Sequence, residues 1–166
     1  MKHFVNKIGI RLMTAFLLSG LSLIVVSGVS SAAPVSVGDQ YGGGKVVYVL
    51  QPGDPGYSAG EQHGFIAATE DLPEESLTWS EAKSAVARLA INGNTGWSLP
   101  TEQQLSLMYQ HQAVVGGFRD YSYYWSGSEI DQQKAWALDF YNGEKVPTIK
   151  SGALTGIRRI RPVKKF

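Results

Sequence analysis

The chain has 166 residues, of which 15 are Lys or Arg, 14 are Asp or Glu and none is cysteine. Without cysteine, disulfides, thiolate metal sites and a cysteine nucleophile are excluded. This length corresponds to one domain, which is large enough to bury a core without crosslinks.

The first 32 residues have the pattern of a secretory signal peptide. Three basic residues precede the apolar run 12–26, and small residues follow in SGVSSAAP. The alternative is an uncleaved membrane anchor, which needs about 20 apolar residues; this run is shorter and is interrupted by Thr, Ser and Gly. We expect export to the periplasm, cell surface or medium, with cleavage after Ala32, or alternatively after Ala33, and no membrane association afterwards.

The first half of the mature chain predicts two strands and two helices. Segments 45–50 (KVVYVL) and 64–68 (GFIAA) predict strands separated by a loop rich in Gly and Pro. Apolar residues at helical spacing from 82 to 90 predict a helix with Ser80 as its cap. Thr101, followed three residues later by Gln104, is a capping-box pattern and predicts the second helix.

Strand patterns return in the second half, in the segments 123–126, 134–141, 144–149 and about 157–163. Asn142-Gly143 predicts a hairpin turn between the second and third of these strands. Strands at both ends with the helices grouped between them predict an α+β fold with an antiparallel sheet and two central helices.

Five motif groups follow one another in residues 37–166: GDQYGGGKVVYVLQPGDPGY with QHGFIAAT, GWSLPTEQQLSLMY, GGF with YYWSGSE, AWALDFYNG, and IRPVKKF. In this order they resemble the Lcl C-terminal-like domain family, a bacterial domain of unknown function named for the C-terminal domain of a collagen-like adhesin that binds sulfated polysaccharides. The resemblance implies a C-type lectin-like fold over residues 37–166 and an exported, adhesin-like protein. Ser98 and Gly127 depart from the family motifs, and no Gly-X-Y repeats precede the domain, so a collagen-like stalk and its trimer are not carried over.

The stretch YSYYWSGSE at 121–129 is unusually aromatic. Large aromatic residues on strands mostly fill cores, so we expect Trp125 and Trp136 to be buried. Tyr121, Tyr123 and Tyr124 can either stack on a sugar ring or fill a sheet face, and we take Tyr121 and Tyr123 as the binding candidates. Glu129 is expected to accept hydrogen bonds from backbone or tryptophan N–H groups in a loop.

The C-terminal residues GIRRIRPVKKF contain five basic and no acidic residues, in an otherwise acidic mature chain. The basic residues are Arg158, Arg159, Arg161, Lys164 and Lys165. Displayed as a ridge, they would bind the sulfates or carboxylates of an anionic polysaccharide. Alternatively, they solvate an edge strand that Pro162 protects from aggregation. We do not expect nucleic acid as a partner, because the mature chain is acidic and exported.

Enzyme motifs are incomplete in this sequence, and we expect no cofactor and no metal. The P-loop and the G-x-S-x-G elbow are both broken, and His63 and His111 lack zinc-ligand spacing. Asp54 in a carbonyl-rich loop is a weaker candidate for calcium. The sequence therefore predicts a non-catalytic, adhesin-type domain that binds an anionic polysaccharide or another envelope component through the basic C-terminal residues. The alternatives are a structural or protein-interaction module of an envelope assembly and, more distantly, a hydrolase using Glu129, Asp139 or His111.

Overall fold

The structure is a computed structural model that describes residues 33–74, 77–151 and 157–166. The expected signal peptide at 1–32 lies outside the described residues. In the part that is described, none of the helices has the length and apolar character needed to cross a bilayer.

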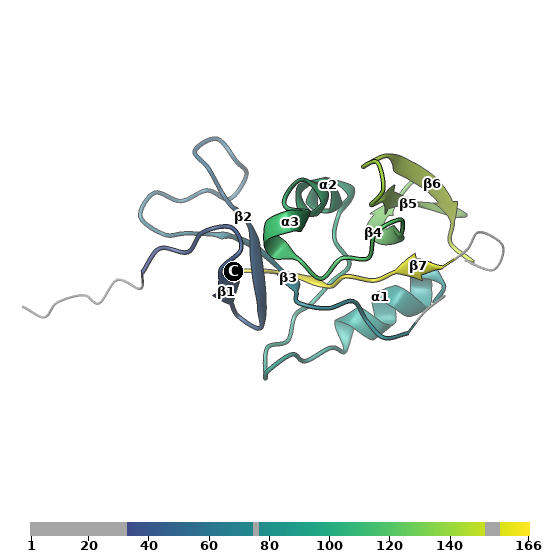
Figure 1. The fold of residues 1–166 in the computed structure, drawn as a ribbon, viewed down its shortest axis with the longest axis horizontal. Coiled ribbons are helices and arrows are strands. Elements are labelled where there is room, and N and C mark those ends of the chain that lie inside the picture. Colours follow the sequence, from purple (N-terminus) through teal and green to yellow (C-terminus); the bar gives the residue numbers. More distant parts are fainter. Residues whose placement is uncertain (1–32, 75–76, 152–156) are drawn as a thin grey trace, which may run out of the picture. The chain divides into compact units, whose positions relative to one another are not determined.

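Two four-stranded sheets form the framework (Figure 1). The first has the order β1-β2-β3-β8 and is antiparallel throughout; its strands are β1 (Gln40–Tyr41), β2 (Gly44–Val49), β3 (Gly64–Ala68) and β8 (Val163–Lys165). The second has the order β6-β5-β4-β7; its strands are β4 (Tyr123–Glu129), β5 (Lys134–Asp139), β6 (Lys145–Ile149) and β7 (Arg158–Arg159). The β4–β7 pair is parallel. The α+β class is therefore confirmed. The predicted antiparallel pairing holds throughout the first sheet, whereas the second sheet is mixed because of the β4–β7 pair.

Three described helices lie between the sheet segments in the sequence: α1 (Trp79–Ala87), α2 (Glu102–Gln110) and the short α3 (Gln112–Val115). The predicted capping box of α2 is present, since Thr101 and Gln104 each accept the other's backbone N–H. The predicted cap of α1 is wrong. Thr78 caps this helix through a reciprocal pair with Glu81, so α1 begins before Ser80.

The hairpin prediction is confirmed, because β5 pairs antiparallel with β6 across Asn142-Gly143. Strand β5 is covered on both faces. The structure has two core clusters. Ala135 and Ala137 belong to the first, which contains Trp125, and Leu138 belongs to the second, which contains Tyr124. Alanine allows the large rings of the first cluster to approach the sheet closely.

The tryptophan predictions have different outcomes. Trp125 is fully buried in the first core cluster together with Trp79 and Trp97. Trp136 is only partly buried, so its expected core position is wrong. It lies opposite Pro147 on β6, which is at the edge of the second sheet.

The expected last strand at 157–163 is in fact two short strands in different sheets. β7 pairs with β4, and β8 pairs with β3. Residues 160–162 connect them and are buried. Figure 1 shows this yellow segment running from β7 in one sheet toward β3 in the other. The C-terminal segment therefore joins the two sheets.

Candidate functional site

The basic C-terminal residues do not form the expected ridge. Arg161 has no exposed surface, and its Nε lies 2.7 Å from Asp71 Oδ1. Arg158 is only 5% exposed, and its guanidinium lies 4.6 Å from the centre of the Tyr123 ring. Burial lowers the pKa of Arg158. The prediction that Arg158 and Arg161 contact a ligand at the surface is therefore wrong.

The other three basic residues of the segment are divided between the sheets. Arg159 is half-buried in β7, whereas Lys164 and Lys165 are in β8. Successive residues of a strand point to opposite faces, so Lys164 and Lys165 are directed apart. Lys164 Nζ donates to Asn94 Oδ1 at 3.2 Å, and Lys165 is exposed. These positions give separate charges in place of one anion-binding surface.

The two tyrosines proposed for sugar stacking differ in exposure. Tyr123 is half-buried, and the Arg158 guanidinium covers one face of its ring. Tyr121 is 75% exposed and stacks on Tyr141, which is 63% exposed. The ring centres are 4.8 Å apart and the ring planes are inclined by 24°. Tyr121 thus remains a candidate, and Tyr141 is a partner that sequence reasoning missed.

Strand register explains why these two tyrosines meet. Tyr123 of β4 lies opposite Asp139 of β5, and beyond this pair Phe140 N donates to Ser122 O at 2.9 Å. One further step along both strands places Tyr121 opposite Tyr141. Directly opposed residues of antiparallel strands have neighbouring side chains. The stack is therefore a cross-strand pair just beyond the end of the β4–β5 ladder.

An open depression of about 560 Å³ adjoins the stacked tyrosines. Its lining residues include four aromatic residues, Phe118, Tyr121, Phe140 and Tyr141, and the polar residues Gln112 and Asp120. A volume of this order lies within the range of small-molecule sites, which combine apolar walls with a few polar groups. Among the described residues that line it, Asp120 is the only one with a charged side chain.

Both tyrosines are held by specific backbone geometry. Tyr121 has φ of +56°, a left-handed conformation that bulky residues rarely adopt. The backbone N–H of Tyr141 donates to Asp139 Oδ1 at 2.8 Å, which fixes the start of the β5–β6 turn. The exposed pair is therefore a defined feature of the fold.

The acidic residues considered for catalysis do not converge. Glu129 and Asp139 lie opposite Ala135 and Tyr123, at the two ends of the β4–β5 ladder. Glu129 Oε2 lies 2.5 Å from Lys150 Nζ, and this hydrogen bond lowers the pKa of Glu129. The expected loop role of Glu129 is thus corrected, because it ends β4 and bonds a lysine.

The residues considered as metal ligands, Asp54 and His63, also make contacts within the chain. The hydrogen bond from the Gln51 backbone, aided by the Tyr48 hydroxyl, lowers the pKa of Asp54, whose carboxylate organises its own loop. His63 Nε2 lies 3.4 Å from the Glu61 carboxylate at the surface. Within residues 33–74, 77–151 and 157–166, no group of three or more His, Asp or Glu side chains has an arrangement that could hold a metal.

Comparison of the chain with models of known protein families gave no match, and comparison with curated protein sequences gave none.

Proposed function

We propose that this chain is an exported, non-catalytic binding domain that recognises a polysaccharide of the cell envelope at the depression beside Tyr121 and Tyr141. The observation that carries the proposal is the stack of two exposed tyrosine rings on the rim of that depression. The motif resemblance to the Lcl C-terminal-like domain family supports it, and with it a C-type lectin-like arrangement of the α+β fold.

The chemistry of the lining suits a sugar. A pyranose ring has an apolar C–H face, which can pack on an aromatic ring, and hydroxyl groups around its edge. Tyrosine offers an apolar ring with a polar hydroxyl, while Gln112 and Asp120 add hydrogen-bonding groups at the same depression. Apolar contact then supplies affinity, and the polar side chains select the orientation of the sugar.

The charge of the site changes the expected ligand. The sequence favoured an anionic polysaccharide bound by arginines, but Arg158 and Arg161 are buried. A sulfate in the depression would instead lie near the carboxylate of Asp120, where like charges repel. We therefore propose a neutral, hydroxyl-rich glycan, whose binding depends little on ionic strength.

A protein-interaction module in an envelope assembly is the second candidate, because exposed tyrosines are also enriched at protein interfaces. The two functions use the same surface but different partners. They are separated by whether the purified protein binds a glycan in the absence of other proteins.

The test is a glycan array probed with protein produced from the full sequence, at low and at high salt. Tyr121→Ala and Tyr141→Ala should each weaken the best interaction about tenfold or more, equivalent to about 1.4 kcal/mol. Tyr57→Ala is the matched control, because Tyr57 is also exposed but does not line the depression. Loss of binding in Lys165→Ala, together with strong salt dependence, would restore the basic-segment hypothesis and refute this proposal. Absence of glycan binding, with Tyr121-dependent capture of an envelope protein, would favour the interaction module.

A further inference from the structure

The loop at 116–121 carries Tyr121 and contributes to the depression, so its placement determines the site. Three of its backbone groups are bonded to side chains from elsewhere in the chain. The carbonyl of Gly116 accepts from Arg161 Nη1 at 3.3 Å, and the carbonyl of Gly117 accepts from Arg161 Nη2. The N–H of Arg119 donates to the hydroxyl of Tyr124 at 2.8 Å.

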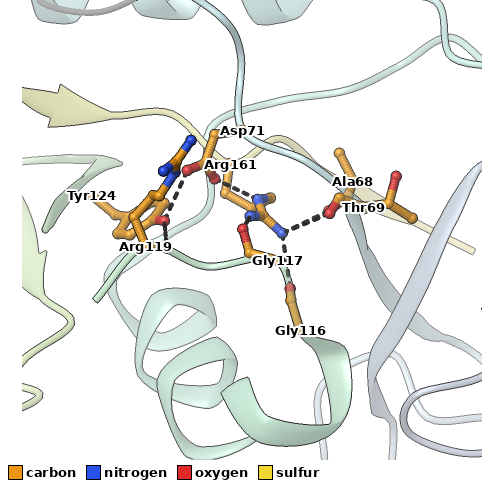
Figure 2. A network of polar contacts seen from close by, with 8 residues as sticks. All are labelled: Ala68, Thr69, Asp71, Gly116, Gly117, Arg119, Tyr124 and Arg161. Carbon is orange, nitrogen blue, oxygen red and sulfur yellow. Dashed lines mark hydrogen bonds and ion pairs between the residues drawn. The ribbon is translucent and has the colours of Figure 1, made fainter. Parts of the chain in front are cut away.

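Arg161 also bonds the end of β3 and the chain that follows it. Its Nη1 donates to the carbonyls of Ala68 and Thr69 at 3.1 and 3.4 Å, and its Nε donates to Asp71 at 2.7 Å. Figure 2 shows the guanidinium between Asp71 on one side and the carbonyls of Ala68, Gly116 and Gly117 on the other. One buried cation therefore connects the end of a central strand to the loop that bears Tyr121.

Tyr124 completes the network. Its hydroxyl donates to Asp71 Oδ2 at 2.9 Å while it accepts the Arg119 N–H (Figure 2). Burial raises the pKa of Tyr124 well above its ordinary value, so the hydroxyl keeps the proton that it donates. Asp71 is thus bonded by Arg161 and Tyr124 together, and both of these residues also bond the loop.

The loop fits closely over the guanidinium. The Arg161 guanidinium carbon lies 4.3 Å from the centre of the Phe118 ring. Gly117 has φ of +75°, and a Cβ added there would lie 2.4 Å from the carbonyl oxygen of Thr69. Only glycine allows this approach, so the loop has little freedom to lie elsewhere while these contacts hold.

We propose that Arg161, with Asp71 and Tyr124, is a positioning element that holds the loop 116–121 so that Tyr121 stacks on Tyr141 and the depression keeps its shape. The inference rests on the proposed function, and it adds a residue that controls ligand affinity without contacting the ligand. Arginine suits this role because its planar fork bonds several acceptors at once, whereas a lysine ammonium is a single point charge.

The experiment compares Arg161→Lys with Val86→Ala in isotope-labelled protein produced from the full sequence. Arg161→Lys keeps the positive charge near Asp71 but cannot reproduce the fork that reaches the Gly116 and Gly117 carbonyls. Val86 is fully buried in the first core cluster, whereas Tyr124 belongs to the second. Val86→Ala therefore lowers the free energy of unfolding without removing a contact to the loop. The readouts are the nuclear Overhauser effect between the Tyr121 and Tyr141 rings and amide hydrogen exchange across the loop.

We expect the ring-to-ring signal to fall at least about threefold and loop exchange to rise at least about tenfold in Arg161→Lys, with neither change in Val86→Ala. If Arg161→Lys does not fold, Tyr124→Phe serves instead, since it removes only the hydroxyl that accepts the Arg119 N–H. The proposal would be overturned if the variants that fold have the same ring-to-ring signal and the same loop exchange rates as Val86→Ala.

These readouts need no ligand, so they remain informative if the protein binds no glycan and the proposed function fails. If the array does identify a glycan, that glycan becomes the probe of a further comparison. Arg161→Lys should then weaken its binding about tenfold or more, because the site loses preorganisation. Unchanged affinity would show that the network does not position the site, even where Tyr121→Ala abolishes binding.

Discussion

Asp71→Asn removes one negative charge from the buried network while keeping the size of the side chain. In the wild type, Asp71 Oδ1 accepts from Arg161 Nε at 2.7 Å, and the Arg161 side chain is fully buried. The neutral amide of the variant leaves the buried, positively charged guanidinium of Arg161 without a carboxylate partner. Breaking a buried ion pair by removing one partner costs about 3–5 kcal/mol.

This cost predicts a large change in melting temperature. Unfolding entropy is about 2.1 cal/mol/K per residue, which gives about 0.27 kcal/mol/K for roughly 130 residues. A loss of about 3–5 kcal/mol therefore corresponds to a fall of about 11–18 °C. The matched control is Glu102→Gln, since the Glu102–Lys145 pair is longer, at 3.4 Å, and partly exposed. Such surface pairs contribute about 0–1 kcal/mol.

The assay is thermal and urea unfolding of wild type, Asp71→Asn and Glu102→Gln at neutral pH. We expect the free energy of unfolding to fall by at least about 2 kcal/mol more in Asp71→Asn than in Glu102→Gln. If the two variants have equal free energies of unfolding, Arg161 is not held as a buried ion pair, and the positioning role proposed for it has no energetic basis.

Further predictions concern backbone geometry, pH and the exposed stack. Gly143→Ala should lower the free energy of unfolding by about 1–3 kcal/mol more than Gly93→Ala, measured by urea denaturation. Both glycines have positive φ, but a Cβ at Gly143 would lie 2.5 Å from the Tyr109 ring, whereas one at Gly93 meets open space. Because the pKa of Glu129 is lowered in the folded protein, its stabilising contribution is present above the unfolded-state pKa, about 4, and is lost as the pH falls through the folded value. The melting-temperature difference between wild type and Glu129→Gln should therefore shrink in that acidic range. Tyr121→Asn should change unfolding free energy by less than about 1 kcal/mol, because relief of positive φ offsets the lost stack, yet it should remove glycan binding on the array.

Elements with strong local signals could be predicted from the sequence. The capping box at Thr101 fixes the start of α2, and Asn142-Gly143 fixes the β5–β6 hairpin. Segment 64–68 is β3 with the predicted limits. In each case, residues within a few positions of one another determine the backbone, so no knowledge of distant contacts is needed.

The fate of the basic segment could not be predicted in the same way. A run of Arg and Lys is normally solvated, and no acidic residue close to Arg161 in the sequence indicates a partner for a buried charge. Its carboxylate partner lies 90 positions earlier in the chain, and the Gly117 carbonyl lies 44 positions earlier. These contacts exist only once both sheets have formed and the C-terminal segment has crossed between them. The contact between Tyr141 and Tyr121 could not be predicted for the same reason, because it depends on the register in which β4 pairs with β5.

The backbone conformation at Tyr121 supports the proposed binding role of the exposed stack. Two non-glycine residues of the described chain have positive φ, Asn92 and Tyr121. Asn92 precedes a glycine in a turn, where asparagine tolerates this conformation. Tyrosine does not, and strain of this kind costs about 1–3 kcal/mol. The stack with Tyr141 recovers about 0.5–1.5 kcal/mol, and a ring that is 75% exposed adds little burial. Asparagine or glycine at this position would give a fold at least as stable, so the stability of the fold does not account for the tyrosine, and this supports the binding role proposed above for its ring.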